Sequence, residues 1–153
     1  MIPTILRFTA LVLIPLSLFL IYFIQPVHGI NIQRVESPGG IVAWLVKDKT
    51  LPLITLRFAF KTGGTAYDPP QKEGLARMVA ALLDEGAGNY SSKEFKKKLA
   101  DNSIKLNFSV SQDNFYVDLY TLKENLDLSF QLLDLALTKP SFKFDEINRI
   151  KSN

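Results

Sequence analysis

Residues 74–88 are Gly-Leu-Ala-Arg-Met-Val-Ala-Ala-Leu-Leu-Asp-Glu-Gly-Ala-Gly, and they predict a helix from about Lys72 to Glu85. The larger apolar side chains recur at helical spacing and therefore share one face of this helix. They are Leu75, Met78, Val79, Leu82 and Leu83. Gly86 and Gly88 follow, and glycine at this place commonly ends a helix. A helix with one apolar face needs a second layer to cover that face, so the flanking segments are expected to supply a sheet.

Two segments before this helix predict β-strands. Ile41–Val46 is an apolar run that ends at Lys47, and Leu53–Phe60 alternates apolar with polar residues. We expect these two strands to pair with each other, because they are close in the chain. A loop with Gly63-Gly64 and Asp68-Pro69-Pro70 then leads to the helix.

A second helix and a hairpin are predicted after the glycines. Ser91 or Ser92 is a suitable N-cap for a helix that runs to about Ala100. Residues 104–110 and 115–120 both alternate apolar with polar side chains around a polar turn. This pattern predicts two antiparallel strands with one buried face.

The last part of the chain predicts two more helices. One runs from Glu124 to about Leu137, and the other is capped by Asp145. The expected apolar face of the first carries Leu126, Phe130, Leu133 and Leu137. The order β-β-α-α-β-β-α-α indicates an α+β fold, with helices on one face of a largely antiparallel sheet.

The N-terminal residues have the layout of a secretory leader. Arg7 precedes the apolar run Phe8–Ile24, and Val27-His28-Gly29 has small or branched residues where a signal peptidase cleaves. Residues 1–29 are interpreted as a signal peptide, with a retained N-terminal anchor as the alternative. In both cases we expect residues 32–153 to be exported, either free in the periplasm or anchored facing it. Membrane contact is then expected only through an uncleaved leader.

Composition excludes several classes of function. The net charge is only +3 at pH 7, which is too small for a nucleic-acid-binding face. Lys96-Lys97-Lys98 is the one dense basic cluster, and we interpret it as the solvated face of a helix.

The chain has no cysteine, and its single histidine, His28, lies in the leader. A lone His28 is either an isolated metal ligand or part of the cleavage region. Because zinc sites use several imidazole or thiolate ligands, we expect no metal site.

A series of short motifs occurs in a definite order along the chain. They are Phe58–Gly64, Tyr67–Pro70, Gly74–Ala76, Glu85–Gly88, Ser92–Leu99, Asn107, Asp113 and Leu137–Phe142. In this order they resemble the N-terminal domain of the pitrilysin/insulinase family of zinc peptidases. The resemblance covers residues 32–152 and implies the metallohydrolase fold of that family. It also implies that residues 32–153 are a peptidase-like domain truncated at its C-terminal end.

The resemblance fails at the catalytic motif. Active family members carry His-x-x-Glu-His directly after the Gly-Leu-Ala, with two zinc ligands and a general base on one helix. Here the matching positions are Arg77, Ala80 and Ala81. The resemblance therefore implies that zinc, the cofactor of active members, is absent and that no residue is catalytic. The family's third ligand, a glutamate, would fall just past Asn153.

Arg77 has two alternative interpretations, and two acids near the end of the helix have one. Arg77 either pairs with Glu73 one turn earlier or contacts a partner's acidic surface or a bound peptide. We interpret Asp84 and Glu85 as solvated acids at the end of the helix.

Three functions are compatible with the sequence. The leading hypothesis is a non-catalytic partner of a catalytic zinc-peptidase homologue, forming a heterodimer and binding that subunit or a peptide. A peptide would add to a sheet edge, which either strand of the hairpin could present. The alternatives are an active zinc metalloendopeptidase and a non-functional fragment of a split gene, with an open apolar sheet edge.

Overall fold

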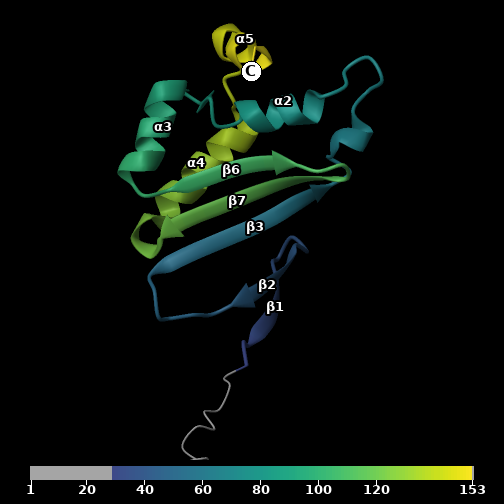
Figure 1. Ribbon diagram of the computed structural model, residues 1–153. Helices are drawn as coiled ribbons and strands as arrows, with labels where there is room; N and C mark the ends of the chain where they lie inside the picture. The colour runs from purple at the N-terminus through teal and green to yellow at the C-terminus, as the bar shows by residue number, and fades with distance from the viewer. Residues whose placement is uncertain (1–28, 153) are drawn as a thin grey trace, which may run out of the picture. The chain divides into compact units, whose positions relative to one another are not determined.

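The computed structural model describes residues 29–152 (Figure 1). The interpretation of residues 1–29 as a leader, including His28, lies outside the described residues apart from Gly29. The chain divides into two compact units, Met1–Asp48 and Lys49–Asn153. Between residues 29 and 152, no helix is long and apolar enough to cross a membrane.

The described part of the first unit is an antiparallel hairpin of β1 (Ile32–Glu36) and β2 (Val42–Val46). The Ser37 hydroxyl closes its turn by accepting a hydrogen bond from the Ile41 N–H at 3.0 Å. The sequence prediction missed β1, which is the hairpin partner of β2. The chain reverses at Ser37-Pro38-Gly39-Gly40, so β2 pairs with the strand before this turn.

The second unit is built on a three-stranded antiparallel sheet in the order β3-β7-β6. Its strands are β3 (Leu53–Lys61), β6 (Lys105–Val110) and β7 (Asn114–Leu122). The predicted hairpin of β6 and β7 is confirmed, with Lys105 opposite Tyr120 and Val110 opposite Phe115. Because β7 is central, β3 and β6 are the edge strands of this sheet, and of the two hairpin strands only β6 can present an edge.

Four helices and a small ribbon complete the second unit. The helices are α2 (Leu75–Leu82), α3 (Ser92–Asp101), α4 (Leu126–Thr138) and α5 (Phe144–Lys151). Short 3₁₀ turns, η1 (Thr65–Tyr67) and η2 (Lys123–Asn125), precede α2 and α4, and the ribbon pairs β4 (Gly86–Ala87) with β5 (Tyr90–Ser91). The α+β class is confirmed, with α2, α3 and α4 packed against the sheet.

The core lies between the sheet and these helices. Alternate residues of β6 and β7 are buried toward the helices, among them Leu106, Val117 and Leu119. Phe95 of α3 and Leu132 of α4 pack in the same cluster and are almost fully buried. The opposite sheet face carries the intervening polar and aromatic side chains, as alternation in a strand requires.

Ser91 is the N-cap of α3, as predicted. Its hydroxyl accepts a hydrogen bond from the Glu94 N–H at 3.4 Å, and its own N–H donates to the Glu94 carboxylate at 2.9 Å. This reciprocal pair is a capping box, which satisfies two backbone donors at the start of the helix.

Three helix boundaries differ from the prediction. Helix α2 begins at Leu75 rather than Lys72, because Gly74 has a left-handed φ of 87° that does not continue a helix. Helix α4 begins at Leu126, after η2 instead of at Glu124. Helix α5 begins at Phe144 with Lys143 as its N-cap, so Asp145 lies in the first turn and does not cap the helix.

The buried face of α4 also differs from the predicted one. Phe130 is 46 % exposed, while Ser129 is fully buried and donates its hydroxyl to the Leu126 carbonyl at 2.7 Å. The face that packs on the sheet carries Ser129, Leu132, Leu133 and Ala136. Small residues at two of these four positions allow the helix to approach the strands closely.

Candidate functional site

The three motif positions lie on α2, but not in equivalent surroundings. Arg77 and Ala81 are exposed, whereas Ala80 is buried at 8 % exposure. Residues four apart share one side of a helix, so Arg77 and Ala81 lie on the same exposed face. In residues 29–152, no group of three or more His, Cys, Asp or Glu side chains is placed to hold a metal ion. This face of α2 offers a guanidinium and a methyl group to a ligand.

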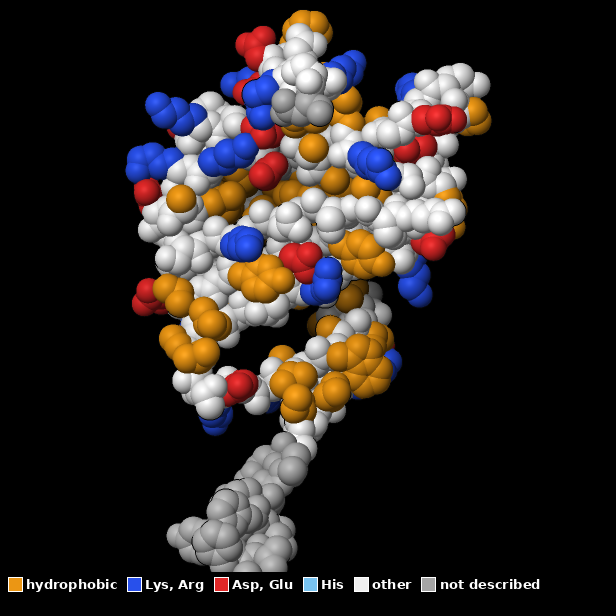
Figure 2. Space-filling model, in the orientation of Figure 1, with side chains coloured by type: hydrophobic (Ala, Val, Ile, Leu, Met, Phe, Trp, Pro, Cys, Tyr) orange, Lys and Arg blue, Asp and Glu red, His pale blue; other side chains and the backbone are white. Residues whose placement is uncertain are grey.

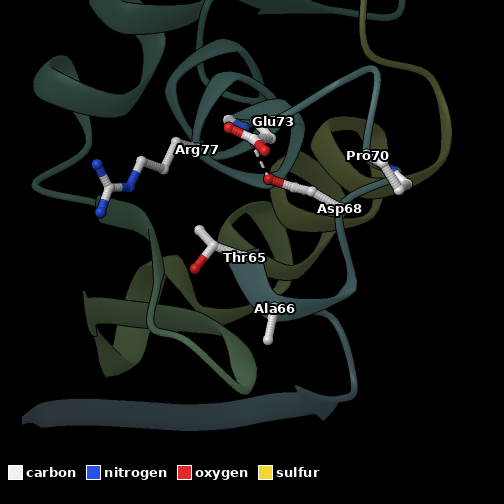
Figure 3. Close-up of a pocket in the computed structure, with 7 residues that line it drawn as sticks. Thr65, Ala66, Asp68, Pro70, Glu73 and Arg77 are labelled. Atoms are coloured by element: carbon white, nitrogen blue, oxygen red, sulfur yellow. Dashed lines mark hydrogen bonds between the residues drawn. The ribbon is translucent and has the colours of Figure 1, made fainter.

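A cavity of about 480 Å³ lies beside the N-terminal end of α2 (Figure 3). Residues of η1, of the proline loop and of α2 line it, including Thr65, Asp68, Glu73 and Arg77. Asp68 accepts hydrogen bonds from the N–H groups of Gly74 at 2.8 Å and Ala76 at 2.9 Å. The carboxylate therefore satisfies two otherwise free donors at the start of the helix, which no residue of the helix itself caps.

Arg77 does not pair with Glu73. No ion pair of Arg77 is present in the part of the chain that the structure describes, and Figure 3 shows its side chain directed away from Glu73 and Asp68. The predicted pair one turn apart is therefore wrong. The other interpretation, contact with a partner or a peptide, stays a prediction.

The Asp68 cap leads to a first prediction. Replacing Asp68 with alanine removes both acceptors from the start of α2, and we expect unfolding free energy to fall by about 1–2 kcal/mol. Chemical denaturation of the full chain measures this change. The matched control is Asp134→Ala on the exposed surface of α4, which should stay within about 0.5 kcal/mol of the parent. Equal effects of the two substitutions would contradict the capping role.

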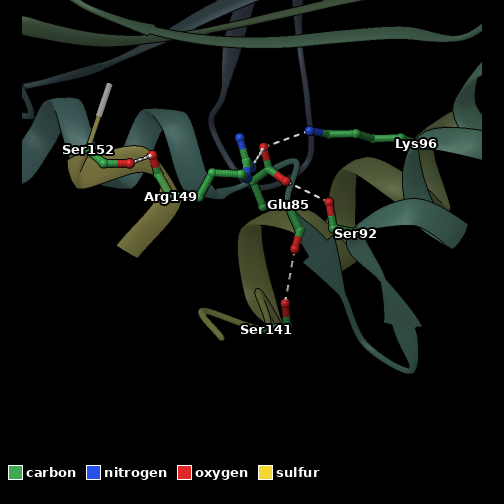
Figure 4. Close-up of polar contacts among 6 residues, drawn as sticks. All are labelled: Glu85, Ser92, Lys96, Ser141, Arg149 and Ser152. Atoms are coloured by element: carbon green, nitrogen blue, oxygen red, sulfur yellow. Dashed lines mark hydrogen bonds and ion pairs between the residues drawn. The ribbon is translucent and has the colours of Figure 1, made fainter. Parts of the chain in front are cut away.

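Glu85 lies just beyond α2 and is buried, so its interpretation as a solvated acid is wrong. One carboxylate oxygen accepts from Lys96 at 2.6 Å and from Arg149 at 2.5 Å (Figure 4). The other accepts from the Ser92 hydroxyl at 2.6 Å, and the Glu85 carbonyl accepts from Ser141 at 3.3 Å. The carboxylate therefore joins α3 to α5, and the backbone carbonyl of the same residue is bonded to the segment after α4. Lys96 therefore pairs with a buried carboxylate and is not simply part of a solvated basic face.

Two pKa values near this cluster shift in opposite directions. Burial alone would raise the pKa of the Glu85 carboxyl, but the hydrogen bonds that it accepts outweigh burial and lower its pKa to about 2. Asp84 is half-buried, and burial raises the pKa of its carboxyl. Glu85 is thus ionised throughout the physiological range and holds its partners by charge.

The rest of the basic cluster is also engaged. Lys97 pairs with Asp101 one turn later at 2.6 Å, and the Lys98 ammonium lies 5.4 Å from the centre of the Tyr90 ring. Both contacts are local to α3 and β5. They support the interpretation as a helix surface for Lys97 and Lys98 only.

The exposed edge of β6 runs next to α2. The Ser111 N–H donates to the Asn114 carbonyl at 2.9 Å, which fixes the alternation of the β6–β7 ladder. By this alternation, the backbone groups of Leu106, Phe108 and Val110 point away from β7. Within the described second unit no strand pairs with this edge. It therefore offers a row of free donors and acceptors to an added strand.

Comparisons with known proteins agree on one family. The family described as Insulinase (Peptidase family M16) matches residues 45–153. The protein called "Non-peptidase homolog YmxG" from Helicobacter pylori (strain ATCC 700392 / 26695) is 30 % identical over 102 residues, which are 67 % of this chain and 23 % of that protein. The chain thus spans about a quarter of the length of this relative.

Two solved structures share the fold. A peptidase M16 inactive domain from Pseudomonas fluorescens superimposes with a TM-score of 0.71 and 22 % identity, over 80 % of this chain and 30 % of that one. A protease from Helicobacter pylori gives a TM-score of 0.65 and 23 % identity, over 81 % and 30 %. The family match extends over more than half of the sequence and includes the whole of the sheet and helices of the second unit. The chain belongs to the insulinase family of peptidases.

Proposed function

We propose that this chain is a non-catalytic member of the insulinase family, which acts as the partner subunit of a catalytic zinc peptidase and binds extended peptide. The observation that carries this proposal is the set of residues at the motif positions of α2, Arg77, Ala80 and Ala81. Alanine binds no metal and accepts no proton. A guanidinium stays charged at physiological pH and repels a dication.

The similar proteins support the non-catalytic part of this proposal. One is named a non-peptidase homologue and another an inactive domain. The peptide-binding part is supported by the free edge of β6 beside α2. Main-chain hydrogen bonds to such an edge give affinity for many sequences, as a partner of a peptidase requires.

Metal analysis tests the lack of catalysis. We expect the purified full chain to hold far less than one equivalent of zinc and to hydrolyse no peptide, because α2 presents no imidazole. The matched variant is Arg77→His with Ala81→His, which places two imidazoles four residues apart on the exposed face of α2 and should raise zinc affinity. Stoichiometric zinc in the parent chain, with hydrolysis that a chelator stops, would overturn the proposal.

Co-expression tests the partnership. We propose that the chain is exported, so a tagged full-length form should fractionate with the periplasm or its membranes. There it should co-purify with a homologue that carries His-x-x-Glu-His and should raise that subunit's peptide hydrolysis. Two results would count against a partner role. One is recovery of the tagged chain without such a homologue, and the other is unchanged peptide hydrolysis by the homologue when the two proteins are mixed.

A further inference from the structure

Two cations lie on opposite faces of the β6 edge, and they indicate which peptides it selects. This inference rests on the proposed function, because it assumes that an extended peptide pairs with β6. A strand added to an edge points alternate side chains to the two faces of the sheet. Charges on each face of β6 therefore meet different sets of peptide side chains.

Lys105 supplies the cation on the face away from the helices. Its neighbour Leu106 is buried toward the helices, so Lys105 points to the other side, where its ammonium lies 5.9 Å from the ring centre of Tyr120. The carboxylate of that face, Asp118, is 6 % exposed and is paired with Arg57 at 2.9 Å. Figure 2 shows basic, acidic and hydrophobic side chains side by side over the strands of the second unit. Lys105 is therefore the positive charge that β6 itself places on this face.

Arg77 supplies the cation on the helix side. It is exposed on α2, which packs beside β6. It lines the same cavity as Thr65, whose N–H donates to the Ser111 carbonyl at 3.0 Å just after β6 ends. Arg77 therefore lies toward the hairpin end of β6, whereas Lys105 is the first residue of the strand.

No neighbouring carboxylate neutralises either of these two cations in the part of the chain that the structure describes. Neither Arg77 nor Lys105 forms an ion pair in the described residues 29–152. Strand β6 itself, Lys-Leu-Asn-Phe-Ser-Val, contains no acid. Asp68 is engaged at the start of α2, and Glu73 lies on the side from which Arg77 turns away.

We propose that the β6 edge binds extended acidic peptides, with two carboxylates an odd number of residues apart. The odd spacing follows because the two cations lie on opposite faces of the added strand. Their positions at opposite ends of β6 favour a separation of about five residues, since a strand rises about 3.4 Å per residue. The acids give selectivity, while the backbone of β6 supplies most of the affinity.

Fluorescence anisotropy with labelled ten-residue peptides tests this inference on the full chain. The peptides share an alternating Thr/Val background and carry two glutamates five apart, two glutamates four apart, two lysines five apart, or no charge. We expect affinity to fall in the order of five-apart acids, four-apart acids, neutral, then basic. The affinity of the peptide with acids five apart should exceed that of the neutral peptide by on the order of three- to tenfold at low salt. This difference in affinity should shrink as the salt concentration rises.

Variants of the protein assign this selectivity to the two cations. Lys105→Gln and Arg77→Gln should each remove part of the preference for acids, and together they should abolish it while binding of the neutral peptide is kept. Lys139→Gln, at the exposed end of α4, is the matched control and should change nothing. An acidic preference that survives the double substitution would overturn the inference.

One further peptide separates the two possible failures. A neutral peptide N-methylated at alternate residues cannot form the hydrogen bonds of an added strand and should not bind. If neutral and acidic peptides bind equally and methylation abolishes both, edge binding stands and the acidic preference is wrong. If no peptide binds, or methylation has no effect, edge binding fails and the acidic preference fails with it.

Discussion

Replacing Glu85 with glutamine is expected to lower the unfolding free energy at pH 7 by about 3 kcal/mol. The glutamine has nearly the same shape but no charge, so Lys96 and Arg149 lose their shared anion. Breaking a buried ion pair by removing one partner costs about 3–5 kcal/mol. The lower end applies because the Lys96 and Arg149 side chains are 46 % and 52 % exposed and regain water in the variant.

The same substitution is expected to remove a pH dependence. The pKa of Glu85 is about 2 in the folded chain, below the ordinary value of 4.5 that it has when unfolded. Its contribution is therefore fully present above about pH 4.5 and is lost as pH falls toward 2. The full contribution is about 3 kcal/mol from this difference in pKa, in agreement with the cost of breaking the pair.

Urea unfolding at pH 7 and at pH 3 measures both effects. The parent should lose stability between these values, and Glu85→Gln should lose less. Glu124→Gln, an exposed carboxylate in η2, is the matched control and should follow the parent at both values. If Glu85→Gln unfolds at the same urea concentration as the parent at pH 7, the carboxylate does not hold the helices together.

Short-range patterns predicted the elements that depend on neighbouring residues. The N-cap at Ser91 and the hairpin of β6 and β7 follow from residues within a few positions of each other, and both are confirmed. The family also followed from the sequence, because its motifs keep their order along the chain. The positions of Arg77, Ala80 and Ala81 on one helix were predicted in the same way.

Contacts between distant residues were not predicted. Strand β3 pairs with β7, about sixty residues later, and hydrophobic alternation does not say which of several strands becomes its neighbour. Glu85 appeared solvated because acids at helix ends usually are, and its partner Arg149 is on another helix. The one local signal was the neighbouring glycine. Gly86 has a φ of 108°, a conformation that favours glycine, at the point where the chain has left α2 and enters β4.

The hairpin partner of β2 was missed for a different physical reason. The sequence Ile32–Glu36 is short and carries two charges, so its alternation is weaker than that of Leu53–Phe60. The turn at residues 37–40 was the stronger signal, since Pro-Gly-Gly between two short apolar segments is typical of a hairpin. Weighting turn residues above strand hydrophobicity would have given the observed partner.

Replacing Gly64 with alanine is expected to destabilise the second unit by about 3 kcal/mol, because no room exists for a side chain. A Cβ at this position would meet the Gln112 carbonyl oxygen at 2.2 Å and the Asp113 carbonyl carbon at 2.5 Å. Both are backbone atoms of the β6–β7 turn and cannot rotate away. The clash must separate this turn from η1, which is held to it by hydrogen bonds to Ser111 and Gln112.

Loss of that contact is also expected to weaken peptide binding, since η1 and the turn together position the cavity beside Arg77. Denaturation gives the change in stability, and anisotropy with the five-apart acidic peptide gives the change in affinity at temperatures where the variant is still folded. Gly39→Ala is the matched control, because its Cβ would meet only the Ser37 hydroxyl at 3.9 Å. If Gly64→Ala were as stable as Gly39→Ala, the approach of the turn to η1 would be looser than described. If it were destabilised but bound the peptide unchanged, the Arg77 end of β6 would not take part in recognition, and selectivity would depend on Lys105 alone.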